Sequence, residues 1–244
     1  MFFCIKNVRY TFIMTNEELH TRARDYAHKH KKRIAKEITD LFPSESDPVS
    51  VFMAGSPGAG KTEVSKELVQ EVAGDNQQVL RIDTDDLRHM FEGYTGDNSH
   101  IFQLPSSILA EKIHDFALQR RQSFIFDGTF SNLEKAEINI QRSLKRHRYI
   151  KILYVYQQPE KAWFFAKSRE LIEGRKIKKG DFINKYFGSR EVVNAIKKKY
   201  GPGVEVDVLV KDFDGKDKLY FRNVDLIDNY VPEKYTQDDL EKKL

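Results

Sequence analysis

Apolar residues in the chain occur in two patterns, short unbroken runs and recurrences every three or four positions. Short runs that end at glycine or polar residues are typical of buried strands, whereas the wider spacing is typical of helices. Strands are predicted at 49–54, 79–82, 123–126, 149–156, 204–210 and 219–221. Helices are predicted at 16–40, 62–72, 106–119, 133–146, 159–173 and 181–199. This alternation predicts an α/β fold, with a parallel sheet that is covered by helices on both faces.

The same pattern suggests how the chain is divided. Pro43 and Pro48 end the first predicted helix and supply a short linker. Thr15 and Glu18 form a capping-box pattern, which indicates that the first helix opens at this point. Residues 1–14 are expected to be a leader that is non-native or disordered, and residues 15–47 a helix with its linker. Residues 48–200 are expected to form the core, and residues 201–244 short strands and a tail of the same domain.

Composition and charge indicate the cell compartment in which the protein is expected and the surfaces it offers to ligands. The 244 residues include one cysteine, so a disulfide within the chain is excluded and a reducing compartment is expected. No apolar run approaches the roughly 18 residues that a membrane span needs, which predicts a cytoplasmic protein with no membrane partner. The net charge is +4, but segment 167–200 holds eleven Lys/Arg against four Asp/Glu. This segment is interpreted as a solvated helical surface, a surface that faces phosphate groups, or both on different faces.

A glycine-rich loop follows the first predicted strand directly. Its residues are Gly55, Ser56, Pro57, Gly58, Ala59, Gly60, Lys61 and Thr62. Glycines let backbone N–H groups approach anionic oxygens with no Cβ in the way. In a loop of this pattern the lysine neutralises the β- and γ-phosphates, and the threonine hydroxyl binds Mg²⁺. We therefore predict a nucleotide site with Lys61 on the phosphates and Thr62 as the Mg²⁺ ligand.

Polar residues follow the second and third predicted strands. Asp83 and Asp85 lie in the first of these turns, and Asp127 and Thr129 lie in the second. Ligands bind beyond the carboxyl ends of parallel strands, so the glycine-rich loop and both turns are expected on one rim. Phosphoryl transfer needs a carboxylate for the proton of the acceptor hydroxyl and a way to hold Mg²⁺. Asp83 and Asp85 are the candidates, with a helix cap as the alternative role for either.

In their order and spacing these motifs resemble the zeta-toxin family of kinases, over about 49–200. The motifs are Gly55–Thr62, Ile82-Asp-x-Asp85-x-x-Arg88, Asp127-Gly-Thr129, Arg169 and Arg175. The resemblance implies an adenylate-kinase-like P-loop fold with a basic helical lid segment, and ATP and Mg²⁺ as cofactors. It also implies phosphate transfer to the 3′-hydroxyl of UDP-N-acetylglucosamine, a toxin role against cell-wall synthesis, and an antitoxin protein as a candidate partner.

The resemblance also implies residue roles. Asp85 is expected as the catalytic base, and Lys61 and Thr62 as ligands of phosphate and Mg²⁺. Arg169 and Arg175 are expected to clamp the transferred phosphate. Substrate binding is expected from Asp83, Arg88, Asp127 and Thr129.

Three departures from the family pattern all lie on the acceptor side. His89-Met90 stands where a His-Pro pair is common, and Asp127 replaces the glutamate of a Glu-Gly-Thr motif. No basic residue follows Thr129 closely, because the next residues are Phe130, Ser131 and Asn132. The nucleotide side of the pattern is intact. An ATP-dependent phosphotransferase is therefore expected, with UDP-N-acetylglucosamine as the family's default acceptor.

Two other functions stay open from the sequence. Basic segments 142–151 and 167–200 favour a polynucleotide or nucleoside kinase, but no platform of aromatic and basic strand residues for stacked bases is evident, so nucleic acid is not an expected partner. A catalytically inactive nucleotide-binding regulator would need neither Asp85 nor Arg175. A GTPase is not expected, because the segment at 184–187 lacks the aspartate of a guanine-binding motif. The aromatic run at 163–165 is predicted to pack in the core.

Overall fold

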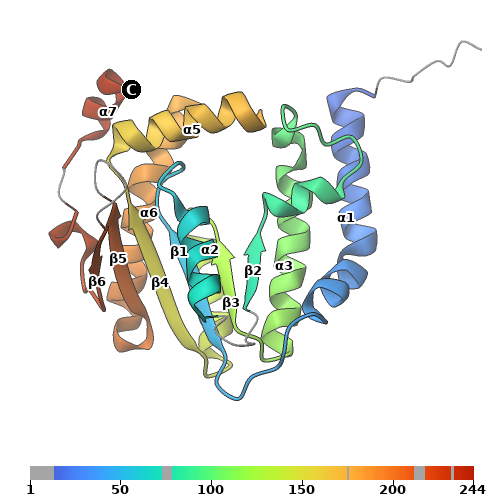
Figure 1. Ribbon diagram of the computed structural model, residues 1–244, viewed down its shortest axis with the longest axis horizontal. Coiled ribbons are helices and arrows are strands. Elements are labelled where there is room, and N and C mark those ends of the chain that lie inside the picture. Colours follow the sequence, from blue (N-terminus) through green and yellow to red (C-terminus); the bar gives the residue numbers. More distant parts are fainter. Residues whose placement is uncertain (1–13, 73–78, 175, 212–217, 232–233) are drawn as a thin grey trace, which may run out of the picture.

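The computed structural model describes residues 14–72, 79–174, 176–211, 218–231 and 234–244 (Figure 1). In this part of the chain six strands form one sheet in the order β2-β3-β1-β4-β5-β6. Every neighbouring pair is parallel except β5 with β6. The strands are β1 (Val49–Ala54), β2 (Leu80–Asp83), β3 (Phe124–Asp127), β4 (Tyr149–Tyr156), β5 (Glu205–Lys211) and β6 (Lys218–Phe221). The predicted α/β fold is confirmed.

Helices connect the strands and cover both faces of the sheet. They are α1 (Asn16–Thr39), α2 (Lys61–Val72), α3 (Gln103–Gln119), α4 (Leu133–Leu144), α5 (Pro159–Glu173), α6 (Lys179–Tyr200) and α7 (Gln237–Lys243). Short 3₁₀ helices are η2 (Asp86–Met90), η3 (Ser99–Phe102), η4 (Gly201–Gly203) and η5 (Ile227–Asn229). The predicted helices are present, with ends shifted by less than a turn. Helix α7 was not predicted, although Thr236 and Asp239 form a capping box that signals its start.

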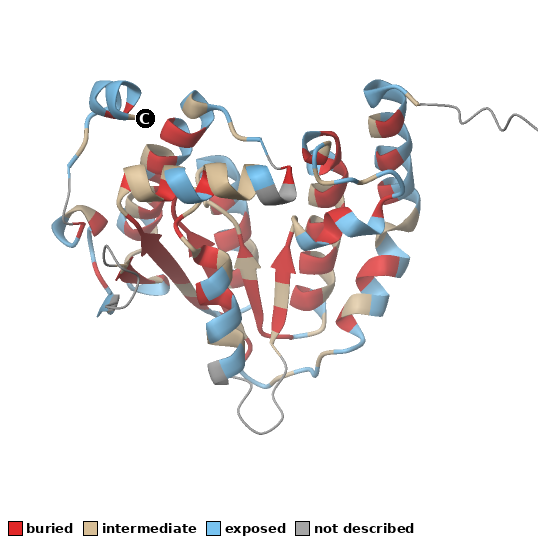
Figure 2. Cartoon of the chain, turned by 45° about the horizontal axis from the view of Figure 1, so that its top comes forward, coloured by how far each residue is buried: buried red, intermediate tan, exposed pale blue. Residues whose placement is uncertain are grey.

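Side chains alternate across the strands and therefore feed two separate cores. On one face, Met53, Leu153 and Leu209 pack against helix α2. On the other face a larger core includes Phe52 and Ile152 together with buried residues of α1, α3, α4 and α6. Helix α1 lies along α3 at the outside of this larger core (Figure 1). Strands β1 to β5 are buried over most of their length, as Figure 2 shows, whereas Leu219 and Tyr220 of β6 are exposed.

Helix α5 corrects one prediction about the core. Trp163 is partly buried and packs edge-on against Phe182, with ring centroids 5.1 Å apart. Phe164 and Phe165, however, are exposed, the first by 64%. The prediction of core packing for the whole aromatic run was therefore wrong. The buried face of α5 consists instead of small residues such as Ala162 and Ala166, because the glycine-rich loop approaches the backbone of α5 closely.

Candidate active site

The glycine-rich loop joins β1 to α2 and has a conformation that only glycine adopts readily. Gly55, Gly58 and Gly60 have φ angles of +134°, +74° and +80°, a region that costs other residues free energy. A Cβ on Gly58 would lie 2.0 Å from the carbonyl oxygen of Ala162. The loop is therefore seated directly on α5. Because α2 begins at Lys61, its first N–H groups and the positive end of its dipole face the loop, an arrangement suited to phosphate.

Lys61 is buried at the first position of α2. Its ammonium group donates hydrogen bonds to the carbonyl oxygens of Gly55, at 3.0 Å, and Ser56, at 2.7 Å. Burial lowers the pKa of Lys61 to about 8, and the nearby carboxylates of Asp127 and Asp83 oppose that effect. The side chain is still mainly protonated at neutral pH. It supplies a cation inside the loop, where phosphate oxygens would bind.

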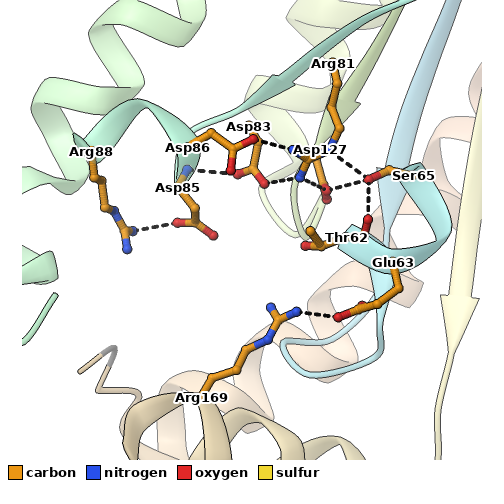
Figure 3. Close-up of polar contacts among 10 residues, drawn as sticks. All are labelled: Thr62, Glu63, Ser65, Arg81, Asp83, Asp85, Asp86, Arg88, Asp127 and Arg169. Atoms are coloured by element: carbon orange, nitrogen blue, oxygen red, sulfur yellow. Dashed lines mark hydrogen bonds and ion pairs between the residues drawn. The ribbon is translucent and has the colours of Figure 1, made fainter. Parts of the chain in front are cut away.

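In the acidic turn after β2, the carboxylates of Asp83 and Asp85 differ in their exposure to solvent. Asp83, the last residue of β2, is buried, and its Oδ1 accepts a hydrogen bond of 2.9 Å from the backbone N–H of Asp85. The Asp85 side chain is 34% exposed and forms an ion pair of 3.0 Å with Arg88. Arg88 is itself buried and donates to Gln103 at 2.5 Å. Asp85 is thus the carboxylate that faces open space (Figure 3).

The turn after β3 lies beneath the glycine-rich loop. Asp127 is buried, and its Oδ2 lies 2.9 Å from the hydroxyl of Ser65 and 2.9 Å from a guanidinium nitrogen of Arg81. The Thr129 carbonyl accepts a hydrogen bond of 3.2 Å from the N–H of Gly55. Asp127 therefore contacts helix α2 and strand β2 beside the loop, whereas Thr129 contacts the loop itself. Arg81 and Ser65 were missed from the sequence; the signal was that Arg81 and Asp83, two apart in a strand, share one face of the sheet.

Arg169 reaches the loop from the opposite side, on helix α5. Its guanidinium donates a hydrogen bond of 2.8 Å to Glu63, in the first turn of α2 (Figure 3). Glu63 was not among the predicted residues, because its partner lies far away in the sequence. Arg175 lies outside the described residues, so its expected role stays a prediction.

One cavity of about 660 Å³ brings these elements together. Its lining includes Thr62, Asp83, Asp85, Tyr94, Asp97 and Arg169. Of the remaining predicted residues that the structure describes, neither loop residues 55–61 nor Arg88, Asp127 and Thr129 are among those that line it. The start of α2, the acidic turn and Arg169 therefore meet at this cavity, on the rim that the ends of the parallel strands predict, and a second group of residues supports them from behind.

The residues present fit a magnesium-bound nucleoside triphosphate. The loop offers N–H groups and one buried ammonium, and the Thr62 hydroxyl belongs to the cavity lining. Within the described ranges, no group of three or more His, Cys, Asp or Glu side chains has a metal-binding arrangement. Mg²⁺ in nucleotide sites is usually coordinated by phosphate oxygens and water, with few ligands from the protein.

The chain is similar to a known protein family and to several solved structures. A family model described as zeta toxin matches residues 31–225, which supports a kinase-type phosphotransferase. Among solved structures, one from the PezAT chromosomal toxin–antitoxin system of Streptococcus pneumoniae superposes with a TM-score of 0.65 at 16% identity, covering 93% of this chain and 98% of the other. Two structures of the AvrRxo1-ORF1:ORF2 complex, with sulphate ions and with ATP, have TM-scores of 0.58 and 0.57 at 14% identity, covering 90% of this chain and 74% of theirs. These likenesses confirm the fold.

No curated protein matches the sequence significantly. Of the helices within the described residues, none combines the length and the apolar character that crossing a bilayer requires.

Proposed function

Because the chain belongs to the zeta toxin family, we propose that it transfers the γ-phosphate of ATP to a hydroxyl group of a small metabolite. The observation that carries the proposal is the single cavity that Thr62, Asp85 and Arg169 share. These residues come from three elements, and each supplies a different requirement of phosphoryl transfer. They are a cation-binding hydroxyl beside the phosphate loop, a carboxylate for the acceptor, and a guanidinium for the transferred group.

On the nucleotide side, the loop N–H groups and the start of α2 hold the phosphates. Lys61 exchanges its contacts with the Gly55 and Ser56 carbonyls for phosphate oxygens. The Thr62 hydroxyl is proposed to hold Mg²⁺, which supplies neutralisation of the charge on the β- and γ-phosphates. Arg169, now paired with Glu63, is close enough to the loop to bind the transferred phosphoryl group, and Arg175 is proposed to assist it.

On the acceptor side, Asp85 is proposed to take the proton of the attacking hydroxyl. It is accessible from the cavity, and Arg88 orients its carboxylate from behind. A positioned general base of this kind typically contributes 10²- to 10⁴-fold to the rate. Asp83, Arg88, Asp127 and Thr129 are proposed as acceptor-binding residues on the family pattern. Asp83 is the one of the four that belongs to the cavity lining.

UDP-N-acetylglucosamine is the acceptor that we propose to test first. Phosphorylation of its 3′-hydroxyl in the cytoplasm would deprive cell-wall synthesis of a precursor and make the protein a toxin. An antitoxin protein that covers the nucleotide site is the proposed partner. These three points rest on the family, whereas the kinase proposal also rests on the cavity.

The test is transfer of label from γ-labelled ATP with Mg²⁺, first to UDP-N-acetylglucosamine and then to a bacterial metabolite extract, with the product identified by mass. Lys61→Ala is expected to abolish transfer. Asp85→Asn is expected to lower kcat by about 10²-fold or more while the Kd for ATP stays within about threefold, because the base does not hold the nucleotide. Asp25→Asn, on the exposed surface of α1, is the matched control.

The outcomes separate the parts of the proposal. A wild-type protein that binds no ATP and labels no compound contradicts the kinase. A full rate in Asp85→Asn contradicts the base. Labelling of another metabolite, but not of the nucleotide sugar, corrects the acceptor alone. Growth that continues in bacteria expressing soluble wild-type protein contradicts the toxin role.

A further inference from the structure

Arg81 is a largely buried arginine, with its side chain 12% exposed, that contacts three segments of the active-site rim. It lies on β2 two residues before Asp83, so both side chains point to the face of the sheet that α2 covers. Its guanidinium forms ion pairs with Asp83, Asp86 and Asp127, the last at 2.9 Å. Its Nε donates a hydrogen bond of 2.9 Å to the hydroxyl of Ser65 on α2. Figure 3 shows the guanidinium between these partners.

Arg81 offsets the repulsion between two carboxylates that the register of β2 and β3 places next to each other. Asp83 and Asp127 are direct neighbours across β2 and β3, and both are buried. Two carboxylates at this spacing repel each other, and burial makes the repulsion stronger than in water. A cation between them offsets that repulsion. Burial works against the charge on Arg81, yet Asp83 and Asp127 raise the pKa of its guanidinium above the usual value.

Through its partners, Arg81 is connected by hydrogen bonds to Asp85 and to Thr62. Asp83, held by Arg81, accepts the N–H of Asp85 at 2.9 Å and so fixes the start of the acidic turn. Ser65, also held by Arg81, lies 3.0 Å from the carbonyl oxygen of Thr62. Arg81 therefore connects the turn that carries the proposed base to the first turns of the phosphate-binding helix.

We infer that Arg81 is a positioning residue, which sets the placement of Asp85 relative to Thr62 and the phosphate loop. The donors of its guanidinium are taken up by three aspartates and Ser65, so it acts through these residues and not by binding a substrate. The inference rests on the proposed kinase function. A displacement of about 1 Å between reacting groups can cost on the order of 10²-fold in rate.

The test compares Arg81→Gln and Arg81→Lys with the wild-type protein. Arg81→Gln is expected to lower kcat for phosphate transfer at least tenfold and to leave KM for ATP within threefold, because residues 55–60 of the loop are held by α5 and by the Thr129 carbonyl and not by Arg81. Arg81→Lys restores the positive charge without the fork of donors and is expected to recover a part of the lost rate. Arg33→Gln, which removes an exposed arginine paired with Glu37 at 2.8 Å, is the matched control and is expected to behave as the wild type.

Amide hydrogen exchange provides a second measurement that does not depend on activity. In Arg81→Gln, the amides of residues 83–86 and 61–66 are expected to exchange faster, whereas those of β4 and β5 keep the wild-type rates. A wild-type kcat in Arg81→Gln overturns the inference. So does faster exchange spread evenly over the sheet, since that would indicate general destabilisation.

The failure of the proposed function is distinguishable from the failure of this inference. If the wild-type protein transfers phosphate to no acceptor, the proposed function is wrong. The exchange measurement then decides alone whether Arg81 holds the two segments together.

Discussion

The close contact between the phosphate loop and helix α5 leads to a prediction about Gly58. A Cβ at this position would lie 2.0 Å from the carbonyl oxygen of Ala162 and 3.0 Å from the backbone nitrogen of Ala166. Both atoms belong to a helix backbone, which cannot turn away as a side chain can. Gly58→Ala must therefore displace the loop or the helix by roughly 1 Å or more before ordinary van der Waals contact is restored.

The magnitude follows from two costs. The φ angle of +74° at Gly58 costs an L-residue about 1–2 kcal/mol. Shifting packed backbone adds a comparable amount, so we expect the free energy of unfolding to fall by about 2–4 kcal/mol. ATP affinity is expected to fall further than stability alone explains, because the loop N–H groups move away from the phosphate positions. On the order of 10²-fold is a reasonable scale for a displacement of this size.

Two other glycines make a graded series for the assay. Gly60 has a φ angle of +80°, but its added Cβ would meet the Nζ atom of Lys211, at 2.1 Å, which is the end of a flexible side chain. Gly60→Ala is therefore expected to lose less than Gly58→Ala. Gly180, near the start of α6, has no atom within 4 Å of such a Cβ. Gly180→Ala is expected to leave ATP affinity unchanged and stability unchanged or slightly higher, since alanine favours a helix.

Chemical denaturation would measure the stability of each variant, and titration with Mg·ATP would measure its affinity. The expected order of losses in affinity is Gly58→Ala, then Gly60→Ala, then none for Gly180→Ala. Wild-type affinity and stability in Gly58→Ala would refute the reasoning. Equal losses in all three variants would refute it too, because they would show that the contact with α5 is irrelevant.

Two further predictions concern buried basic side chains away from the cavity. Burial, followed by the charge of Arg142, lowers the pKa of His114 well below its usual value, so near pH 6.5 the unfolded chain binds a proton that the folded chain does not. The free energy of unfolding of the wild type should therefore fall by up to about 1.4 kcal/mol per pH unit below pH 6.5. Denaturation at pH 7.5 and 5.5 should show a smaller fall for His114→Gln than for the wild type. Arg148 donates hydrogen bonds to three oxygen atoms at 2.5–3.0 Å, so Arg148→Met should lower the free energy of unfolding, measured by denaturation, by about 2–4 kcal/mol. The same substitution at the exposed Arg146 should leave it almost unchanged. An equal loss in both variants would contradict the role of these hydrogen bonds.

Much of the framework follows from local patterns. The limits predicted for β1 and β4 agree with the structure, because each is a mainly apolar run, with Ser50 or Lys151 as its one interruption, that ends at proline, glycine or polar residues. The glycine-rich loop was predictable for a similar reason, since glycines within eight residues supply the whole conformation. The carboxyl ends of parallel strands lie on one rim, so the loop and the turn of Asp83 and Asp85 could be assigned to that rim without any coordinates.

The contacts across the rim could be decided only by the tertiary structure. Arg81 bridges Asp83 and Asp127 because β2 pairs with β3 in one particular register. Glu63 pairs with Arg169 because α5 crosses the phosphate loop. Hydrophobic spacing reports which side of an element is buried, but it carries no information on the partner that covers it.

Helix α5 illustrates the same limit. Its aromatic run was expected in the core because large apolar residues are usually buried. The loop beneath α5 leaves room only for small residues, so Ala162 and Ala166 face inward and Phe164 faces solvent. The sequence by itself determined the strands, the helices and the phosphate-binding loop, since these depend on neighbours in the chain. Which carboxylate is buried, which is accessible and which cation joins them depended on distances between segments far apart in the sequence.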